Sequence, residues 1–214
     1  MVVIGAKGFA KELLEDLVSD KYNYIEDDLF FFDNISTDVP DKLFNKYKIL
    51  TSIDQVKHIF KTISQDFTIG IGNPKHRKKL SILFEKLGGN LVCVISNKAT
   101  IGSFNNSIKN GVIIRSGAQI TNDISIGKGS LINLNCTIGH DSVIGEFVEL
   151  SPSVNISGHC KIGNQTSVGS GSTILPNITI GENCKIGAGS VITKNIPANS
   201  VVVGVPGKII KKHF

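Results

Sequence analysis

The sequence predicts a small parallel α/β domain followed by a parallel β-helix, with the boundary near residue 95. Three observations predict this fold. Strands and helices alternate through residues 1–95, aliphatic residues recur at every sixth position from 108 to 192, and most of the 11 phenylalanines lie in the first half. A chain of 214 residues is long enough for two such domains, which we assign to residues 1–95 and 96–214.

Short apolar segments alternate with amphipathic ones in the first domain. An apolar run followed by an amphipathic helix is the unit from which Rossmann-like parallel sheets are built. We expect strands at residues 2–5, 29–33, 67–72 and 91–96, and helices at residues 9–20, 52–64 and 75–89.

A glycine-containing loop, Gly5-Ala6-Lys7-Gly8, joins the first expected strand to the first expected helix. The amide groups at a helix N-terminus bind phosphate readily. The loop lacks the complete G-x-G-x-x-G pattern of a dinucleotide site. A tight structural turn and a nucleotide-phosphate site are therefore both open interpretations of this loop.

The second domain is built from a six-residue repeat. From Ile108 to Ile192, fifteen consecutive positions spaced six apart are Ile, Leu or Val. A period of six fits neither a helix nor a simple hairpin. It fits a unit of one short strand and one corner, and three such units close a triangular coil. Five such coils make a prism about 24 Å long. Small or β-branched residues stand four places after the aliphatic ones, at Ala118, Ser130, Cys136, Ser142, Val154, Cys160, Thr166, Ser172, Cys184 and Ser190.

Composition and charge exclude several classes of protein. The net charge of +5 lies wholly in residues 96–214, where it indicates either solubility or attraction of a small polyanion. That domain lacks the arginine density of a nucleic-acid surface. No apolar run approaches the ~20 residues of a membrane span, and the N-terminus does not resemble a signal peptide. The four cysteines form no C-x-x-C motif, so a reduced cytoplasm is expected, and three of them occupy small inward positions where they pack as apolar residues.

His140 and Asp141 are the expected catalytic pair. They follow an Ile-Gly step at a corner of the prism, where a histidine has no core to fill. Histidine titrates near neutral pH and suits a general base, and an adjacent aspartate can hold the ring and stabilise its charged form. Since residues eighteen apart stack between coils, Gly158 lies beside His140 and can offer its N–H to an oxyanion. His159 stacks on Asp141, and it either orients that carboxylate or is itself the base.

The remaining candidate residues lie outside the His140-Asp141 corner. Ser170 and Ala188 also stack, on another corner. Three other histidines, His58, His76 and His213, fall on a helix face, at a helix start and in the tail, where solvated or structural roles are expected. The tail also carries three lysines, for which a solvated tail and phosphate contacts are both open, at Lys208, Lys211 and Lys212.

The GAxG loop, the IGIGNPKHRKKL segment, the hexads and the closing VVVGVPGKII together resemble the sialic acid O-acetyltransferases and nucleotide-aminosugar N-acetyltransferases, a hexapeptide-repeat family. The resemblance implies a left-handed β-helix, a homotrimer, acetyl-CoA bound along the prism by corner residues that include Gly158, Ser170 and Ala188, and a His-Asp catalytic pair. It also implies that the α/β domain binds the sugar nucleotide through Gly5, Ala6, Lys7, Gly8, Asp33 and Gly70. The family usually has a histidine where this chain has Phe9, and Lys7 is more basic than its usual counterpart.

We therefore expect a cytoplasmic enzyme that moves acetyl from acetyl-CoA to the amino group of a nucleotide-linked amino sugar for bacterial surface glycan synthesis, without a metal. One alternative is O-acetylation of a sugar or sialic acid hydroxyl. A zinc enzyme similar to γ-carbonic anhydrase would need three convergent histidines, whereas the prism has two. A non-catalytic scaffold is the third alternative, and the His140-Asp141 pair disfavours it.

Overall fold

The computed structural model describes residues 1–19, 22 and 24–212. The chain forms two compact units, one of residues Met1–Gly72 with His76–Val94 and one of Asn73–Lys75 with Ile95–Phe214. His213, expected in the tail, lies outside the described residues. In the described part of the chain, no helix is both long and apolar enough to cross a bilayer.

A six-stranded sheet forms the centre of the first unit, in the order β3-β4-β2-β1-β5-β6. All neighbouring strands run parallel except β3 and β4, which form an antiparallel hairpin at one edge. In chain order the elements are β1 (Val2–Ile4), α1 (Gly8–Leu17), β2 (Phe30–Phe32), β3 (Lys42–Leu43), β4 (Tyr47–Leu50), α2 (Ile53–Thr62), β5 (Asp66–Ile69), α3 (Pro74–Lys86) and β6 (Asn90–Leu91).

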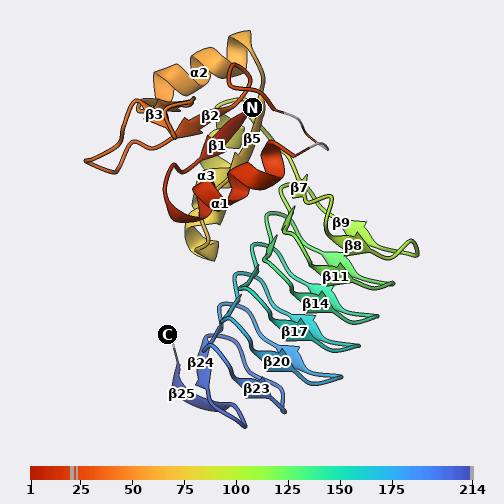
Figure 1. Cartoon of the computed structure of the whole chain (residues 1–214). Helices are drawn as coiled ribbons and strands as arrows, with labels where there is room; N and C mark the ends of the chain where they lie inside the picture. The colour runs from red at the N-terminus through yellow and green to blue at the C-terminus, as the bar shows by residue number, and fades with distance from the viewer. Residues whose placement is uncertain (20–21, 23, 213–214) are drawn as a thin grey trace. The chain divides into compact units, whose positions relative to one another are not determined.

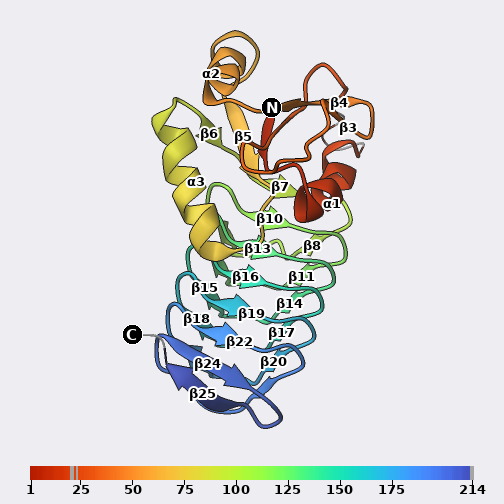
Figure 2. The same ribbon diagram turned by 90° about the vertical axis from the view of Figure 1, so that its left-hand side faces the viewer.

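Helices cover both faces of this sheet (Figure 2). One face packs against α2 and α3 through a core that includes Phe32, Phe67 and Phe84, and the rings of Phe32 and Phe84 meet edge to face at 5.3 Å. Helix α1 packs on the other face, where Leu13 and Leu17 are fully buried. The alternation of strands and helices read from the sequence therefore builds the expected α/β layer structure.

The second unit is a triangular prism of stacked coils (Figure 1). Its three faces are parallel sheets in which each strand pairs with the strand eighteen residues further on, as Ile120 does with Ile138 and Ile138 with Ile156. The first face contains β7 (Val94–Ile95), β10 (Ile113–Ile114), β13 (Leu131–Ile132), β16 (Glu149–Leu150), β19 (Ser167–Val168), β22 (Lys185–Ile186), β24 (Ser200–Val203) and β25 (Lys208–Lys212). The second contains β8 (Thr100–Ile101), β11 (Gln119–Ile120), β14 (Thr137–Ile138), β17 (Asn155–Ile156), β20 (Thr173–Ile174) and β23 (Val191–Ile192), and the third β9 (Ser107–Ile108), β12 (Ser125–Ile126), β15 (Val143–Ile144), β18 (Lys161–Ile162) and β21 (Thr179–Ile180).

The prism extends beyond the repeat found in the sequence at both ends. Ile95 and Ile101 belong to the first coil, but Ile108 follows Ile101 after seven residues instead of six. Because of this one-residue insertion, the six-residue spacing does not include them. At the other end Val202 pairs with Ile186 at a spacing of sixteen. Part of the expected tail forms a strand, because β25 turns back and pairs antiparallel with β24 (Figure 2).

Small residues fill the inward corner positions, as the repeat predicts, and all ten are at most 1% exposed. Their hydroxyl groups join successive coils. The Oγ of Ser142 donates to the carbonyl of Ser157 at 3.1 Å and accepts from the N–H of Cys160 at 3.1 Å. A buried hydroxyl with both partners is satisfied, so this apolar slot also accommodates serine and threonine.

Candidate active site

The candidate catalytic residues lie on the corner between β14 and β15. The corner contains one residue in left-handed backbone conformation on each coil, and Asp141 (φ 59°) and His159 (φ 56°) are two of them. Asn, Asp and His adopt this conformation more readily than most residues. Because the corner is repeated every eighteen residues, the side chains of Asp141 and His159 project next to each other from the surface of the prism.

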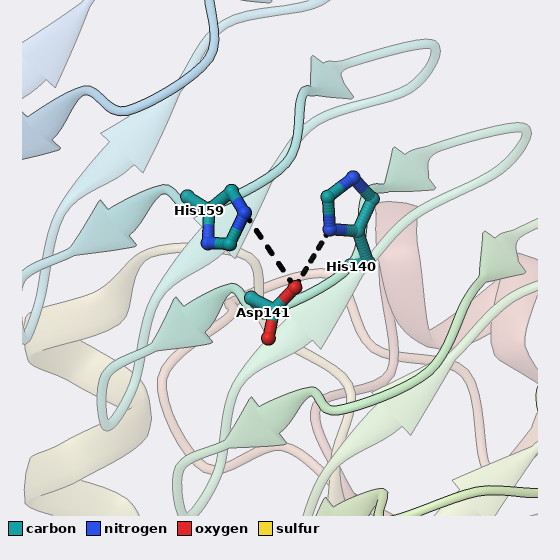
Figure 3. Close-up of side chains that lie close together, drawn as sticks. All are labelled: His140, Asp141 and His159. Carbon is teal, nitrogen blue, oxygen red and sulfur yellow. Dashed lines mark hydrogen bonds and ion pairs between the residues drawn. The ribbon is translucent and has the colours of Figure 1, made fainter.

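His140, Asp141 and His159 form one cluster (Figure 3). The Nδ1 atom of His140 lies 2.7 Å from Oδ2 of Asp141. The Nε2 atom of His159 lies 3.7 Å from the same oxygen. The two imidazole rings meet nearly at right angles, with 5.0 Å between their centroids. One carboxylate oxygen therefore faces a ring nitrogen of each histidine.

The electrostatics of the cluster favour a charged carboxylate. The hydrogen bond from His140 has the largest effect and lowers the pKa of Asp141. Desolvation opposes it, and the charges of His159 and His140 lower the pKa further. The side chains remain 62% (His140), 46% (Asp141) and 55% (His159) exposed. With Asp141 ionised, the tautomer that bonds to it carries its proton on Nδ1 and leaves the Nε2 lone pair of His140 free.

Gly158 lies directly beside the His140 ring. A Cβ at this position would stand 2.7 Å from Nε2 and 2.8 Å from Cε1 of His140, so only glycine permits this ring position. Among the hydrogen bonds of the described residues, none uses the N–H of Gly158. The corner thus presents a base and an uncommitted N–H donor at neighbouring positions on successive coils.

Ser170 and Ala188 lie on a different corner, the one between the first and second faces of the prism. Both are exposed, and the carbonyl of Ser170 accepts from Gly189 N–H at 2.9 Å. The structure therefore does not bring them to His140 within one chain. Lys208, Lys211 and Lys212 lie on exposed strand β25.

A separate cavity of about 230 Å³ lies in the first unit, at the carboxyl ends of β1 and β2. Gly5 and Asp33 line it, and the other lining residues, which the sequence reasoning did not identify, are Ile4, Phe32, Asn34, Ile35, Ser36, Ile71 and Leu80. The Asp33-Asn-Ile-Ser segment directly after β2 was the available signal, since an Asp at such a position commonly starts a side-chain-stabilised turn.

Asp33 organises the wall of this cavity. Its carboxylate accepts from the N–H groups of Ile35 at 3.1 Å and Ser36 at 3.0 Å and from the Ser36 hydroxyl at 2.9 Å. Desolvation raises the pKa of Asp33, but the hydrogen bonds from Ser36 and Ile35 outweigh it and the net shift is downward. The charge of Lys7 acts in the same direction.

The other expected substrate residues have different positions. Ala6 is buried, whereas Lys7, which precedes α1, and Gly8, its first residue, are exposed. No side chain caps the N-terminus of α1. Gly70 does not line the cavity: it is buried, and a Cβ there would lie 2.7 Å from the Cβ of Ala10. Its role is to let α1 approach the sheet.

Comparison with known proteins identifies both units. Residues 1–83 match the PglD N-terminal domain, and residues 159–194 match the bacterial transferase hexapeptide repeat (six repeats). The acetyltransferase domain of PglB from Neisseria gonorrhoeae is 27% identical, with a TM-score of 0.85 and 98% of each chain covered. WeeI from Acinetobacter baumannii is 28% identical, with a TM-score of 0.76 and the same coverage.

A histidine mutant of perosamine N-acetyltransferase from Caulobacter crescentus, in complex with CoA and GDP-perosamine, has the same fold. It is 23% identical with a TM-score of 0.86, over 99% of this chain and 96% of that one. The expected fold, a small α/β domain followed by a left-handed hexapeptide β-helix, is therefore confirmed over the whole length of the chain.

Proposed function

We propose that the chain is a hexapeptide-repeat sugar acetyltransferase with a PglD-type N-terminal domain, and that it transfers acetyl from acetyl-CoA to the amino group of a nucleotide-linked amino sugar. The observation that carries this proposal is the corner cluster, in which His140 bonds Asp141 through Nδ1 and lies with Nε2 beside Gly158. Support for the co-substrate comes from the PglB acetyltransferase domain, whose structure is also known in complex with acetyl coenzyme A.

The geometry suits direct transfer without an acyl-enzyme. The acceptor amine attacks the thioester carbonyl while Nε2 of His140 takes the proton that the amine loses. Asp141 holds Nδ1–H and stabilises the imidazolium that forms, as in other His-Asp pairs. The N–H of Gly158 donates to the oxygen of the tetrahedral intermediate. Collapse of that intermediate expels the CoA thiolate, which then takes up a proton.

A homotrimer follows from the same proposal. Gly158 lies on one prism corner, and Ser170 and Ala188 lie on another, with the second face between them. If all three contact one CoA molecule, the two corners belong to neighbouring copies that pack side by side. The cluster is also half exposed in a single chain, and a neighbouring copy would exclude water from the reacting groups. We therefore propose that the site forms between subunits of a cyclic trimer.

The cavity of the first unit is the proposed nucleotide site. It lies at the carboxyl ends of parallel strands, where doubly wound sheets bind ligands, and its volume of about 230 Å³ suits part of a nucleotide rather than a whole nucleotide sugar. The uncapped N-terminus of α1 and Lys7 are placed to accept the diphosphate. The four free cysteines agree with a reducing compartment, and we propose the cytoplasm.

An acceptor panel tests the activity. The chain is incubated with acetyl-CoA and UDP-, GDP- or dTDP-linked amino sugars, and free thiol release is followed together with the product mass. We expect acetylation of at least one nucleotide-linked amine and none of free sialic acid. Acetylation of sialic acid without any of the amines would instead establish the O-acetyltransferase alternative.

The catalytic assignment has its own test. We expect His140→Ala to lower kcat by about 10²–10⁴-fold while the affinity for acetyl-CoA, measured by calorimetry, changes little. His58→Ala is the matched control, since His58 is an exposed histidine of α2 far in sequence from the cluster. Full activity in the His140 variant would contradict the mechanism.

A further inference from the structure

We propose that His140, Asp141 and His159 form a binding site for a divalent transition metal such as Zn²⁺, and that the bound metal inhibits the enzyme. Each of the three residues offers a ligand atom, and these atoms all lie within 4.8 Å of one another. In the described part of the chain this is the one group of three or more histidine, cysteine, aspartate or glutamate side chains with such an arrangement.

The distances within the cluster are close to those of a zinc site. Zinc binds imidazole nitrogen and carboxylate oxygen at about 2.0–2.2 Å, so two ligand atoms of a tetrahedral ion lie roughly 3.4 Å apart. The distances from Asp141 Oδ2 to His140 Nδ1 and His159 Nε2 are 2.7 and 3.7 Å. The second distance is near this spacing, and the first, a hydrogen bond, must lengthen by about 0.7 Å to reach it. Both side chains are exposed and have room for this adjustment. Three protein ligands leave the fourth position open to water.

The donor atoms of the cluster support the same occupant. Asp141 supplies a carboxylate oxygen, and each histidine supplies a ring nitrogen. Two neutral imidazoles and one carboxylate are the donor set that zinc, cobalt and nickel prefer over magnesium or calcium. The competing cysteines are poor candidates, since Cys136, Cys160 and Cys184 are buried in the prism.

Inhibition follows from the tautomer that the metal imposes. Without metal, the His140 proton resides on Nδ1 and the Nε2 lone pair can accept a proton from the substrate. A metal ion that takes the Nδ1 lone pair displaces this proton to Nε2, so the ring stays neutral but its second nitrogen becomes a donor. Asp141 is then a ligand and no longer holds His140. This inhibition, although not the binding itself, rests on the proposed role of His140 as the base.

The binding experiment uses the whole chain, stripped with a chelator and then titrated with Co²⁺, whose visible absorption reports its coordination. Competition with Zn²⁺ gives the zinc affinity. The test variant is His159→Asn, because Asn177 occupies the equivalent position one coil further on, with φ 64° against 56° for His159. The substitution therefore keeps the corner conformation and removes one ligand. The control is His58→Asn on the exposed face of α2.

We expect one metal per chain for the wild type and for His58→Asn. His159→Asn should bind more than about tenfold more weakly, since even losing a group that only orients a ligand costs that much. Equal affinity in His159→Asn and the wild type would overturn the site, whether or not the chain is an acetyltransferase. Thermal denaturation without metal establishes that the variant is folded.

Activity gives the second readout. Each protein is assayed in chelator and in buffered Zn²⁺, and the fraction of its own activity that remains is compared. The wild type should lose activity over the concentration range in which it binds zinc, and His159→Asn should need at least about tenfold more. Zinc binding at the cluster without any loss of activity would retain the site but overturn its inhibitory role. Should no acceptor be found, the binding result still stands or fails alone.

Discussion

Substitution of Gly158 by alanine tests the catalytic corner most directly. The new Cβ would lie 2.7, 2.8 and 3.2 Å from Nε2, Cε1 and Cδ2 of the His140 ring. Carbon atoms pack at about 3.5–4.0 Å, so the ring must move by roughly 1 Å or rotate into solvent, away from Asp141. A misplacement of about 1 Å can reduce a rate by about 10²-fold. We therefore expect kcat to fall about 10²-fold, although no catalytic group has been removed.

A double-mutant cycle with His140→Ala identifies the cause. Steady-state kcat is measured for the wild type, each single variant and the double variant, with acetyl-CoA and the acceptor at saturation. If Gly158→Ala acts by displacing the ring, it should cost almost nothing once the ring is absent. Additive losses would refute this reasoning and would indicate that the methyl group acts on the thioester itself. Unfolding free energy should change by less than about 1 kcal/mol, because the ring can swing into solvent.

Three other predictions concern the prism and the cavity. Burial raises the pKa of Cys136 to about 11 and also raises the pKa values of Cys160 and Cys184. Iodoacetamide should therefore leave these three cysteines unmodified in the folded chain and label them in denaturant, as measured by mass spectrometry. Ser142→Ala should lower the free energy of unfolding by about 1–3 kcal/mol in urea titrations, because it leaves the buried N–H of Cys160 without an acceptor. Ser142→Cys should lower the free energy of unfolding by less. The folded-state pKa of Asp33 is depressed. Its stabilising effect is therefore present above the ordinary pKa of aspartate and is lost as the pH falls through the folded-state pKa. Asp33→Asn should thus destabilise the chain at pH 7 more than at pH 3.

The fold was predictable because it is repeated. Each six-residue unit places an aliphatic residue inward. A single position that departs from the pattern therefore does not hide it, because the equivalent positions above and below still follow it. The same reasoning failed where the repeat is interrupted, as between Ile101 and Ile108, where seven residues separate consecutive aliphatic positions. It also missed the edge strand β3 and its neighbour β4, since both strands carry exposed lysines, Lys42 and Lys48, among their apolar residues.

The candidate site was predictable to the level of the backbone but not of the side chain. A spacing of eighteen places Gly158 beside His140 and His159 beside Asp141, whatever their rotamers. It does not tell which ring nitrogen faces the carboxylate, nor that both histidines approach one oxygen atom, because these depend on torsions about side-chain bonds. The cavity wall at Ile35 and Leu80 could not be predicted from the spacing of residues. Ile35 lies in a loop and Leu80 in a helix, and no repeat relates the two positions.

The corner explains why the proposed catalytic site and the proposed metal site coincide in this prism. Inward corner positions are filled by small residues, and successive residues of a strand point to opposite faces of its sheet. A left-handed corner residue instead projects along the ridge toward the equivalent residue one coil away. Asp141 and His159 are such a pair. A ridge of this kind tolerates aspartate, asparagine and histidine, which are also the residues that hold protons and metals. In these two proposals the second histidine does not merely duplicate the first: it completes a three-ligand site around the carboxylate that would orient the base.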